Sequence, residues 1–289
     1  MNIKFGTGVA IITPFKKDLS IDYDALSLLI DHVIDGGVEF IVSMGTTGES
    51  AVLSSDEKIS LVSFTKTAIN KRVPLVLGIG GNNTQNVIDQ INNTDFHGVD
   101  AILSASPSYI KPSQEGIYQH FKAISEVSPV DIILYNVPGR TASNMSSKTT
   151  LRLANDFKNI VAIKEASGDI SQIMNILRDK PADFNLYSGD DDLALPLILM
   201  GAQGVISVQA MVQPYEFSEM VRQGISGNIK SAKISHYSQL ELIKYLFIEG
   251  NPSGVKACLE IKGICEQHVR LPLVPVSRET YKKLEVLLK

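Results

Sequence analysis

Residues 131–138 read DIILYNVP and residues 160–167 read IVAIKEAS, with the amphipathic segment MSSKTTLRLAND (145–156) between them. Both outer runs are rich in Val, Ile and Leu and are almost continuously apolar. Such runs are typical of strands that are covered on both faces, as in a parallel sheet. The arrangement predicts a βαβ unit, in which a helix connects two parallel strands.

The same alternation recurs along the whole chain. The apolar runs are residues 8–15, 38–45, 73–80, 100–107, 131–138, 160–167, 184–191 and 204–208. Eight strands that alternate with helices favour an α/β fold of the closed (β/α)8 TIM-barrel type over a doubly wound sheet, and no GxGxxG motif follows the first run. We assign residues 1–225 to the barrel and residues 226–289 to a small C-terminal helical region, whose first helix we expect to complete the barrel.

Composition excludes several classes of protein. The chain has 289 residues, of which 44% are hydrophobic, and a net charge of −4. No apolar run approaches the ~20 residues that span a bilayer, and residues 1–15 lack the basic leader and separate apolar segment of a signal peptide, so we expect a cytoplasmic protein.

The chain has no stripe of basic residues, so nucleic acid is not an expected partner. Cys258, Cys265 and the five histidines lack the spacing of metal ligands, so we expect neither a metal nor a cofactor.

A lysine stands near the end of the sixth run, Lys164. If Val161 and Ile163 face the helices, the period of two points Lys164 into the barrel, near the strand ends where such folds place their active sites. A buried lysine is costly unless it is paired or neutral, and a neutral amine is a nucleophile that forms Schiff bases with carbonyl compounds. The alternative is a structural lysine whose ammonium group reaches the rim.

Polar residues follow other runs as well. The turn GTTGES presents Thr46, Thr47 and backbone N–H groups that could bind a carboxylate, or it is an ordinary loop. Tyr135, in YNVPGRT, is a possible proton carrier or a packed aromatic residue, and Arg140 suits a substrate carboxylate or a surface ion pair. Tyr109 lies in a loop between two prolines and could contact a partner subunit. The acidic run in YSGDDD could bind a metal, but we favour its use as a helix start.

Taken together, these motifs have a recognisable order. GTTGES, YNVPGRT, IKEASGD, YSGDD and GAQGVISV resemble the dihydrodipicolinate synthase family of pyruvate-dependent class I aldolases, and PSQEGIYQHFKAI and NPSGVKA match as well. The resemblance implies condensation of pyruvate with L-aspartate 4-semialdehyde to 4-hydroxy-tetrahydrodipicolinate, in lysine and diaminopimelate biosynthesis. Two alternatives stay open: an N-acetylneuraminate or keto-deoxy sugar-acid aldolase, and a barrel retained as a non-catalytic scaffold.

The resemblance also implies roles for individual residues. Lys164 forms the Schiff base with pyruvate. Tyr135 moves protons and is linked through Thr46 to Tyr109, which reaches across from a neighbouring subunit. Thr47 and the amides of its turn hold the pyruvate carboxylate.

Three further residues complete the implied site. Arg140 binds the carboxylate of aspartate semialdehyde, and Gly189 and Ile206 line the site through their backbone. The resemblance also implies a homotetramer built from two tight dimers. A relay that needs Tyr109 of a second chain would make oligomerisation part of catalysis.

The sequence departs from the family pattern in two places. The family often has two adjacent tyrosines in the loop after the fourth strand, and here the first of them is Ser108. Lysine-inhibited relatives place two histidines and a glutamate in their feedback site. The matching positions here are Ser55, Lys58 and Asn86. We therefore predict weak or absent inhibition by lysine.

Overall fold

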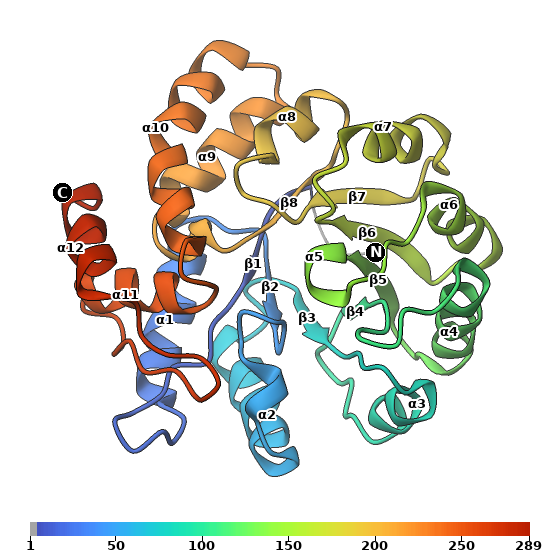
Figure 1. Ribbon diagram of the computed structural model, residues 1–289, viewed down its shortest axis with the longest axis horizontal. Coiled ribbons are helices and arrows are strands. Elements are labelled where there is room, and N and C mark those ends of the chain that lie inside the picture. The colour runs from blue at the N-terminus through green and yellow to red at the C-terminus, as the bar shows by residue number, and fades with distance from the viewer. Residues whose placement is uncertain (1–4) are drawn as a thin grey trace.

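The predicted strands form one closed parallel barrel in the computed structural model, which describes residues 5–289 (Figure 1). Each strand pairs with the next along the chain, and the last pairs with the first, where Gly204 is in register with Gly6. The expected (β/α)8 barrel is confirmed. Part of the argument against a signal peptide rests on residues 1–4, which lie outside the described residues. The strands are β1 (Gly6–Ala10), β2 (Phe40–Ser43), β3 (Leu75–Gly78), β4 (Ala101–Ala105), β5 (Asp131–Asn136), β6 (Ile160–Glu165), β7 (Asn185–Ser188) and β8 (Gly204–Ser207).

Helices surround the strands, as the amphipathic segments predicted (Figure 1). Ser113 and Asp169 cap their helices by accepting hydrogen bonds from the backbone N–H groups of Gly116 and Gln172, and each such cap contributes about 1 kcal/mol. The helices are α1 (Tyr23–Asp35), α2 (Ser55–Ile69), α3 (Thr84–Asn92), α4 (Gln114–Val127), α5 (Pro138–Thr141), α6 (Ser147–Asp156), α7 (Ile170–Asp179), α8 (Ala194–Leu199), α9 (Pro214–Ile225), α10 (Ile229–Phe247), α11 (Ser253–Ile261) and α12 (Arg278–Leu287), with 3-10 turns η1 (Ser50–Val52) and η2 (Gln209–Met211).

Side chains fill the inside of the barrel. The period of two along each strand sends alternate residues to an inner cluster and to the layer between strands and helices. Phe40 and Tyr187 meet edge to face inside the barrel, with ring centroids 5.6 Å apart. A Cβ atom on Gly8 would lie 2.2 Å from the Phe40 ring, so this glycine makes room for the ring. The barrel is therefore a packed core, and only its ends are open to ligands.

The eighth helix of the barrel differs from the expectation. The helix that follows β8 and contacts both β8 and β1 is α9, whereas α10 packs on α8 and α9. The barrel is thus completed by residues 214–225, and the first helix after residue 226 is an additional one. In Figure 1 helices α10–α12 form a layer on one side of the barrel, beside α1. No helix in the range 5–289 is long and apolar enough to cross a membrane.

Candidate active site

Lys164 lies inside the barrel at the end of β6. Ala162, two residues earlier, belongs to the inner cluster, and Ile163 between them packs in the outer layer, as predicted. Val161, which was expected to face the helices, packs against the inner cluster instead, because the pairing with β5 shifts by one residue there. Lys164 is only 6% exposed, and it is in register with Tyr135 on β5 and with Tyr187 on β7. The Lys164 Nζ atom lies 4.6 Å from the centroid of the Tyr135 ring. Among the described residues no carboxylate forms an ion pair with Lys164, so its amine is available to a carbonyl compound.

The loop after β7 passes directly over the lysine stem. The Gly189 N–H donates to the Glu165 carbonyl at 2.7 Å. A Cβ atom at Gly189 would lie 2.5 Å from Ala166 Cβ and 3.1 Å from Lys164 Cε. The close approach requires glycine at this position, and it places the backbone of the loop against the reactive side chain.

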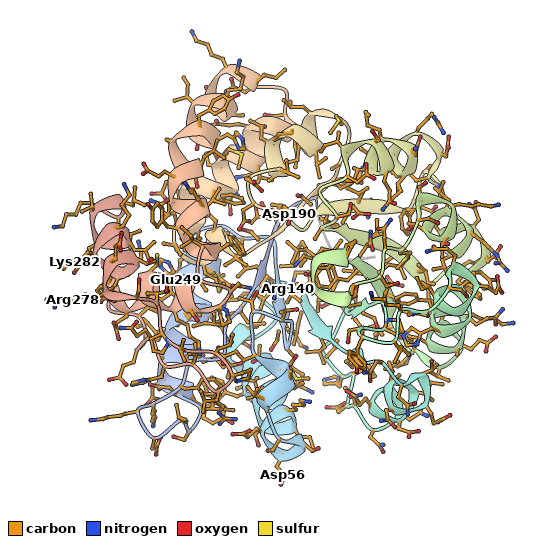
Figure 2. All side chains as sticks on the ribbon, in the orientation of Figure 1. Asp56, Arg140, Asp190, Glu249, Arg278 and Lys282 are labelled. Atoms are coloured by element: carbon orange, nitrogen blue, oxygen red, sulfur yellow. The ribbon has the colours of Figure 1, made fainter. Side chains whose placement is uncertain are left out.

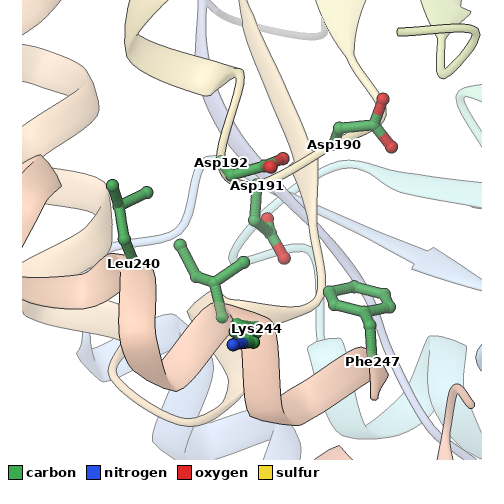
Figure 3. A pocket seen from close by; sticks show the side chains of 7 residues that line it. Asp190, Asp191, Asp192, Leu240, Lys244 and Phe247 are labelled. Carbon is green, nitrogen blue, oxygen red and sulfur yellow. The ribbon is translucent and has the colours of Figure 1, made fainter. Parts of the chain in front are cut away.

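The three acids after Gly189 line a cavity of about 400 Å³ between this loop and α10 (Figure 3). Burial, reinforced by the charge of Asp192, raises the pKa of Asp190 to about 6, and the charge of Lys164 acts in the opposite direction. Asp191 is buried, and its Oδ2 atom accepts hydrogen bonds from the N–H groups of Val208 at 3.1 Å and Gln209 at 2.9 Å.

The favoured helix-start role of this acidic run is therefore wrong. Helix α8 begins at Ala194 without a side-chain cap, and no acidic residue lies in its first turn. The Asp191 carboxylate instead ties the loop after β7 to the loop after β8, because two free backbone N–H groups lie within its reach. Among residues 5–289 no group of three or more His, Cys, Asp or Glu side chains could hold a metal ion.

The GTTGES turn follows β2. Thr47 is 4% exposed, and its Oγ1 atom accepts a hydrogen bond from Asn251 Nδ2 at 2.8 Å. The turn is closed by backbone bonds from Gly48 to Gly45 and from Glu49 to Thr46, at 3.1 and 3.0 Å. Thr46, in contrast, is exposed. The turn therefore presents one fixed and one free hydroxyl group.

The expected hydroxyl relay is not joined within a single chain. Tyr135 is 9% exposed, and in the described part of the chain its hydroxyl forms no hydrogen bond with Thr46 or Tyr109. Tyr109 is 86% exposed and has a positive φ of 70°, a conformation that few side chains adopt without support. Its N–H donates to the Thr141 carbonyl at 3.3 Å, which ties the Tyr109 loop to α5. The tyrosine ring extends into solvent rather than toward this chain's own site.

Arg140 and Ile206 complete the set of predicted residues. Arg140 is an exposed residue of α5, which directly follows β5, and Figure 2 shows it over the centre of the ring of strands. Its guanidinium group forms no ion pair with any described residue, so it can bind a carboxylate from solution. Ile206 lies on β8 within the inner cluster, in register with Gly8.

Comparisons with known proteins match the whole chain. The sequence model of the Dihydrodipicolinate synthetase family matches residues 5–289. The chain belongs to this family.

A 4-hydroxy-tetrahydrodipicolinate synthase of Flavobacterium psychrophilum is 53% identical over all of this chain and 99% of its own. The crystal structure of dihydrodipicolinate synthase from Thermotoga maritima has a TM-score of 0.96 and 39% identity, and covers 99% of this chain and 98% of its own. The chloride-inhibited dihydrodipicolinate synthase from Acinetobacter baumannii, complexed with pyruvate, has a TM-score of 0.95 and 39% identity, with the same two coverages. The family predicted from the sequence is confirmed, and the relatives' names favour a synthase over a sugar-acid aldolase or a scaffold.

Sequence reasoning missed the residues that hold the family motifs in place. Glu49 and Lys256 form an ion pair with an N–O distance of 2.6 Å, and both side chains are buried. Neither was singled out, although each was part of a quoted motif, GTTGES or NPSGVKA. The available signal was a single charge within an otherwise small and apolar segment, because such a charge needs a buried partner.

Glu165, the last residue of β6, is fully buried. Its carboxylate accepts hydrogen bonds from Asn136 at 3.1 Å, from the Ser167 N–H at 2.9 Å and from Gln172 at 3.2 Å. Burial raises the pKa of Glu165, and these hydrogen bonds oppose the shift. The network braces the end of β6 immediately after Lys164.

Proposed function

We propose that this protein condenses pyruvate with L-aspartate 4-semialdehyde through a Schiff base on Lys164, and that the product is 4-hydroxy-tetrahydrodipicolinate. The observation that carries the proposal is the buried amine of Lys164, free of ion pairs and next to the Tyr135 ring. The names of the full-length relatives and the pyruvate complex of the Acinetobacter baumannii enzyme support the choice of substrates.

The chemistry uses side chains alone. The Lys164 amine adds to the ketone of pyruvate and water leaves, which gives an iminium ion. The iminium acidifies the pyruvate methyl group, and loss of one proton gives an enamine. The enamine carbon attacks the aldehyde, whose oxygen gains a proton. The amino group of the semialdehyde then displaces Lys164 from the iminium and closes the ring.

Each of these steps moves a proton, which requires a hydroxyl group near Lys164. We assign this role to Tyr135, because the Lys164 Nζ atom lies 4.6 Å from the centroid of its ring. Thr46 connects it to Tyr109 of a neighbouring subunit in this proposal. Tyr109 is exposed, and within the described part of one chain no hydrogen bond joins Tyr135 to Thr46 or Tyr109. Both observations support the need for a second chain. The relay requires at least a dimer, and we propose a homotetramer built from two tight dimers, as the resemblance to the family implies, in the cytoplasm.

The remaining residues bind the substrates. Thr47 and the amides of its turn hold the pyruvate carboxylate, and Arg140 binds the carboxylate of the semialdehyde through two hydrogen bonds. Gly189 and Ile206 shape the pocket through their backbone, and the approach of Gly189 to the lysine stem supports this role.

Borohydride reduction in the presence of pyruvate tests the proposal. We expect an irreversible adduct on Lys164, located by mass spectrometry of the digested protein, and none in Lys164→Arg. Lys256 is a built-in control, because it is also buried but is paired with Glu49. An unmodified Lys164 would reject the Schiff base. If the adduct forms, pyruvate consumption with aspartate semialdehyde, measured against cleavage of N-acetylneuraminate, separates the synthase from a sugar-acid aldolase.

A further inference from the structure

A hydrogen bond joins the GTTGES turn to the C-terminal region. Asn251, between α10 and α11, donates from Nδ2 to Thr47 Oγ1 at 2.8 Å, across 204 residues of chain. Both residues are buried, at 8% and 4% exposure. The bond is therefore shielded from water, and it fixes the position of a hydroxyl group that the proposed function places on the pyruvate carboxylate.

The bond also restricts where the threonine proton can point. A hydroxyl group has one donor hydrogen and two acceptor lone pairs. The Asn251 amide occupies one lone pair of Thr47 Oγ1, so the hydroxyl hydrogen must be directed elsewhere. Among the described residues it meets no acceptor, because Thr47 makes no other side-chain hydrogen bond. The hydroxyl hydrogen of Thr47 is thus left without an acceptor among the described residues and can donate to a ligand.

We propose that Asn251 is a positioning residue that turns the Thr47 hydroxyl hydrogen toward the carboxylate of pyruvate. The inference rests on the proposed function and deepens it. A donor that is already oriented loses no rotational freedom when the substrate binds, and a hydrogen bond to a charged carboxylate is among the stronger kinds. Without Asn251 the hydroxyl could rotate, and part of this advantage would be lost.

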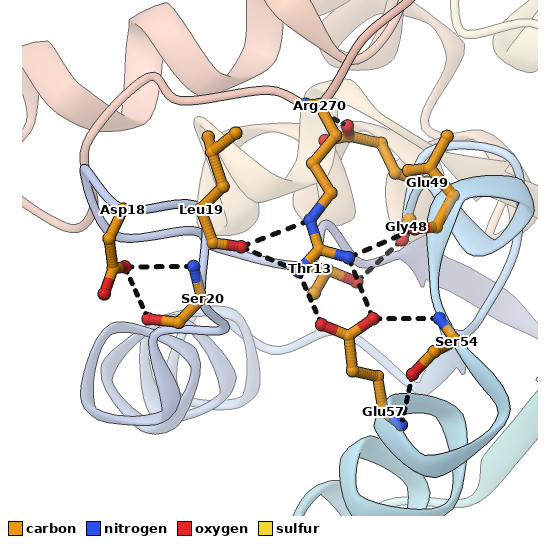
Figure 4. A network of polar contacts seen from close by, with 10 residues as sticks. Thr13, Asp18, Leu19, Ser20, Gly48, Glu49, Ser54, Glu57 and Arg270 are labelled. Atoms are coloured by element: carbon orange, nitrogen blue, oxygen red, sulfur yellow. Dashed lines mark hydrogen bonds and ion pairs between the residues drawn. The ribbon is translucent and has the colours of Figure 1, made fainter.

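The rest of the turn is held by the same region, so Asn251 acts from a rigid support. Lys256 on α11 binds Glu49 Oε1 at 2.6 Å and the His268 carbonyl at 2.7 Å. The N–H of Arg270 donates to Glu49 Oε2 at 3.0 Å, and the Arg270 guanidinium group binds Glu57 at 2.8 Å (Figure 4). The C-terminal region therefore holds the turn on both sides of Gly48, through Thr47 and through Glu49.

The decisive variant is Asn251→Asp, which has nearly the same shape but only accepts hydrogen bonds when ionised. It draws the Thr47 hydrogen to itself and adds a negative charge near the substrate carboxylate. We expect the KM for pyruvate to rise about tenfold or more, with a smaller change in kcat. Lowering the pH protonates the new carboxyl group, which can donate again, so the KM should fall back toward that of the wild type.

Three companion variants make the test specific. Asn251→Ala removes the donor without adding charge, and we expect a smaller rise in KM with no new pH dependence. In a Thr47→Val background the same Asn251→Ala change should add almost nothing, because no hydroxyl is left to orient. Asn155→Asp, on an exposed position of α6, controls for the added charge and should behave like the wild type.

The outcomes separate this inference from the proposed function. If pyruvate is trapped on Lys164 but the KM for pyruvate stays within about twofold of the wild type in folded Asn251→Asp and Asn251→Ala, Asn251 does not position Thr47. An equal effect of Asn251→Ala in the presence and absence of the Thr47 hydroxyl would also reject it. If the wild type traps no pyruvate, the proposed function fails first.

Discussion

Glu49 and Lys256 are 207 residues apart in the chain, yet their side chains meet at 2.6 Å with almost no exposure to solvent. Glu49 belongs to the turn that follows β2, and Lys256 to a helix outside the barrel. The Nζ atom of Lys256 also lies 4.2 Å from the centroid of the Phe15 ring. The pair fixes the C-terminal region to the barrel mouth, so the stability of one depends on the other.

We expect Lys256→Met to lower the free energy of unfolding by about 3–5 kcal/mol, because the buried Glu49 carboxylate would lose its ion-pair partner and keep only the hydrogen bond from the Arg270 N–H. The methionine stem still packs on Phe15, so the loss of packing is small. Urea denaturation followed by circular dichroism measures the change.

Two controls complete this prediction. Adding Glu49→Gln to Lys256→Met should recover part of the loss, since the buried charge is removed. Lys283→Met breaks an exposed pair with Glu241, at 2.7 Å, and should cost less than about 1 kcal/mol. If Lys256→Met and Lys283→Met lowered the free energy of unfolding by similar amounts, burial would not be what makes the Glu49–Lys256 pair important for stability.

A second prediction concerns Gly189. In Gly189→Ala the new methyl group would meet Ala166 at 2.5 Å and the stem of Lys164 at 3.1 Å, so the loop or the lysine must move. We expect the rate of borohydride trapping with pyruvate to fall at least about tenfold, since small displacements of a reacting group are costly. Gly139→Ala, where a Cβ atom meets nothing within 4 Å, should trap pyruvate at the normal rate. Normal trapping by Gly189→Ala would show that the contact is harmless.

The barrel was predictable because its signal is local. A run such as 160–167 shows its burial in its own composition, and the period of two then gives the direction of Lys164. Helix α9 was missed as the eighth helix although it is clearly amphipathic and begins at Pro214, a favoured residue for a first helical turn. Helix α10 is longer, with 19 residues against 12, and its length drew the assignment to it.

The supporting contacts could not be predicted because they join distant parts of the chain. Nothing near Thr47 indicates that Asn251 will lie 2.8 Å away. Asp191 has the composition of a helix start, but it binds backbone N–H groups of a loop that only the closed barrel brings within reach. Sequence patterns thus predicted the barrel and the inward direction of Lys164, whereas the contacts that hold the barrel mouth depend on the tertiary structure.

The third prediction concerns feedback by lysine. Ser55, Lys58 and Asn86 line one cavity of about 840 Å³ between α2 and α3. The Lys58 ammonium group would repel a cationic ligand, and Ser55 and Asn86 are neutral. Two acids, Asp89 and Asp95, also line the cavity. Lys58 and Lys66 balance their charge, and Asp95 is paired with Lys66. We expect L-lysine at millimolar concentration to leave the activity almost unchanged. Lys58→Glu, which replaces the repelling charge with an attracting one, should increase the sensitivity to lysine. Strong inhibition of the wild-type protein would overturn this expectation.

The last prediction follows from Asp190, whose pKa is raised to about 6 by burial and by the charge of Asp192. Its negative charge interacts with Lys164 and would stabilise the iminium ion. Because this charge is present above about pH 6 and lost below it, kcat/KM for pyruvate should decrease as the pH falls through this value. Asp190→Asn should lack this acidic limb. Asp192→Asn removes a like charge, lowers the pKa of Asp190 and should move the limb to lower pH. If kcat/KM for pyruvate still decreased at the same pH in Asp190→Asn, the decrease would be due to the titration of another group.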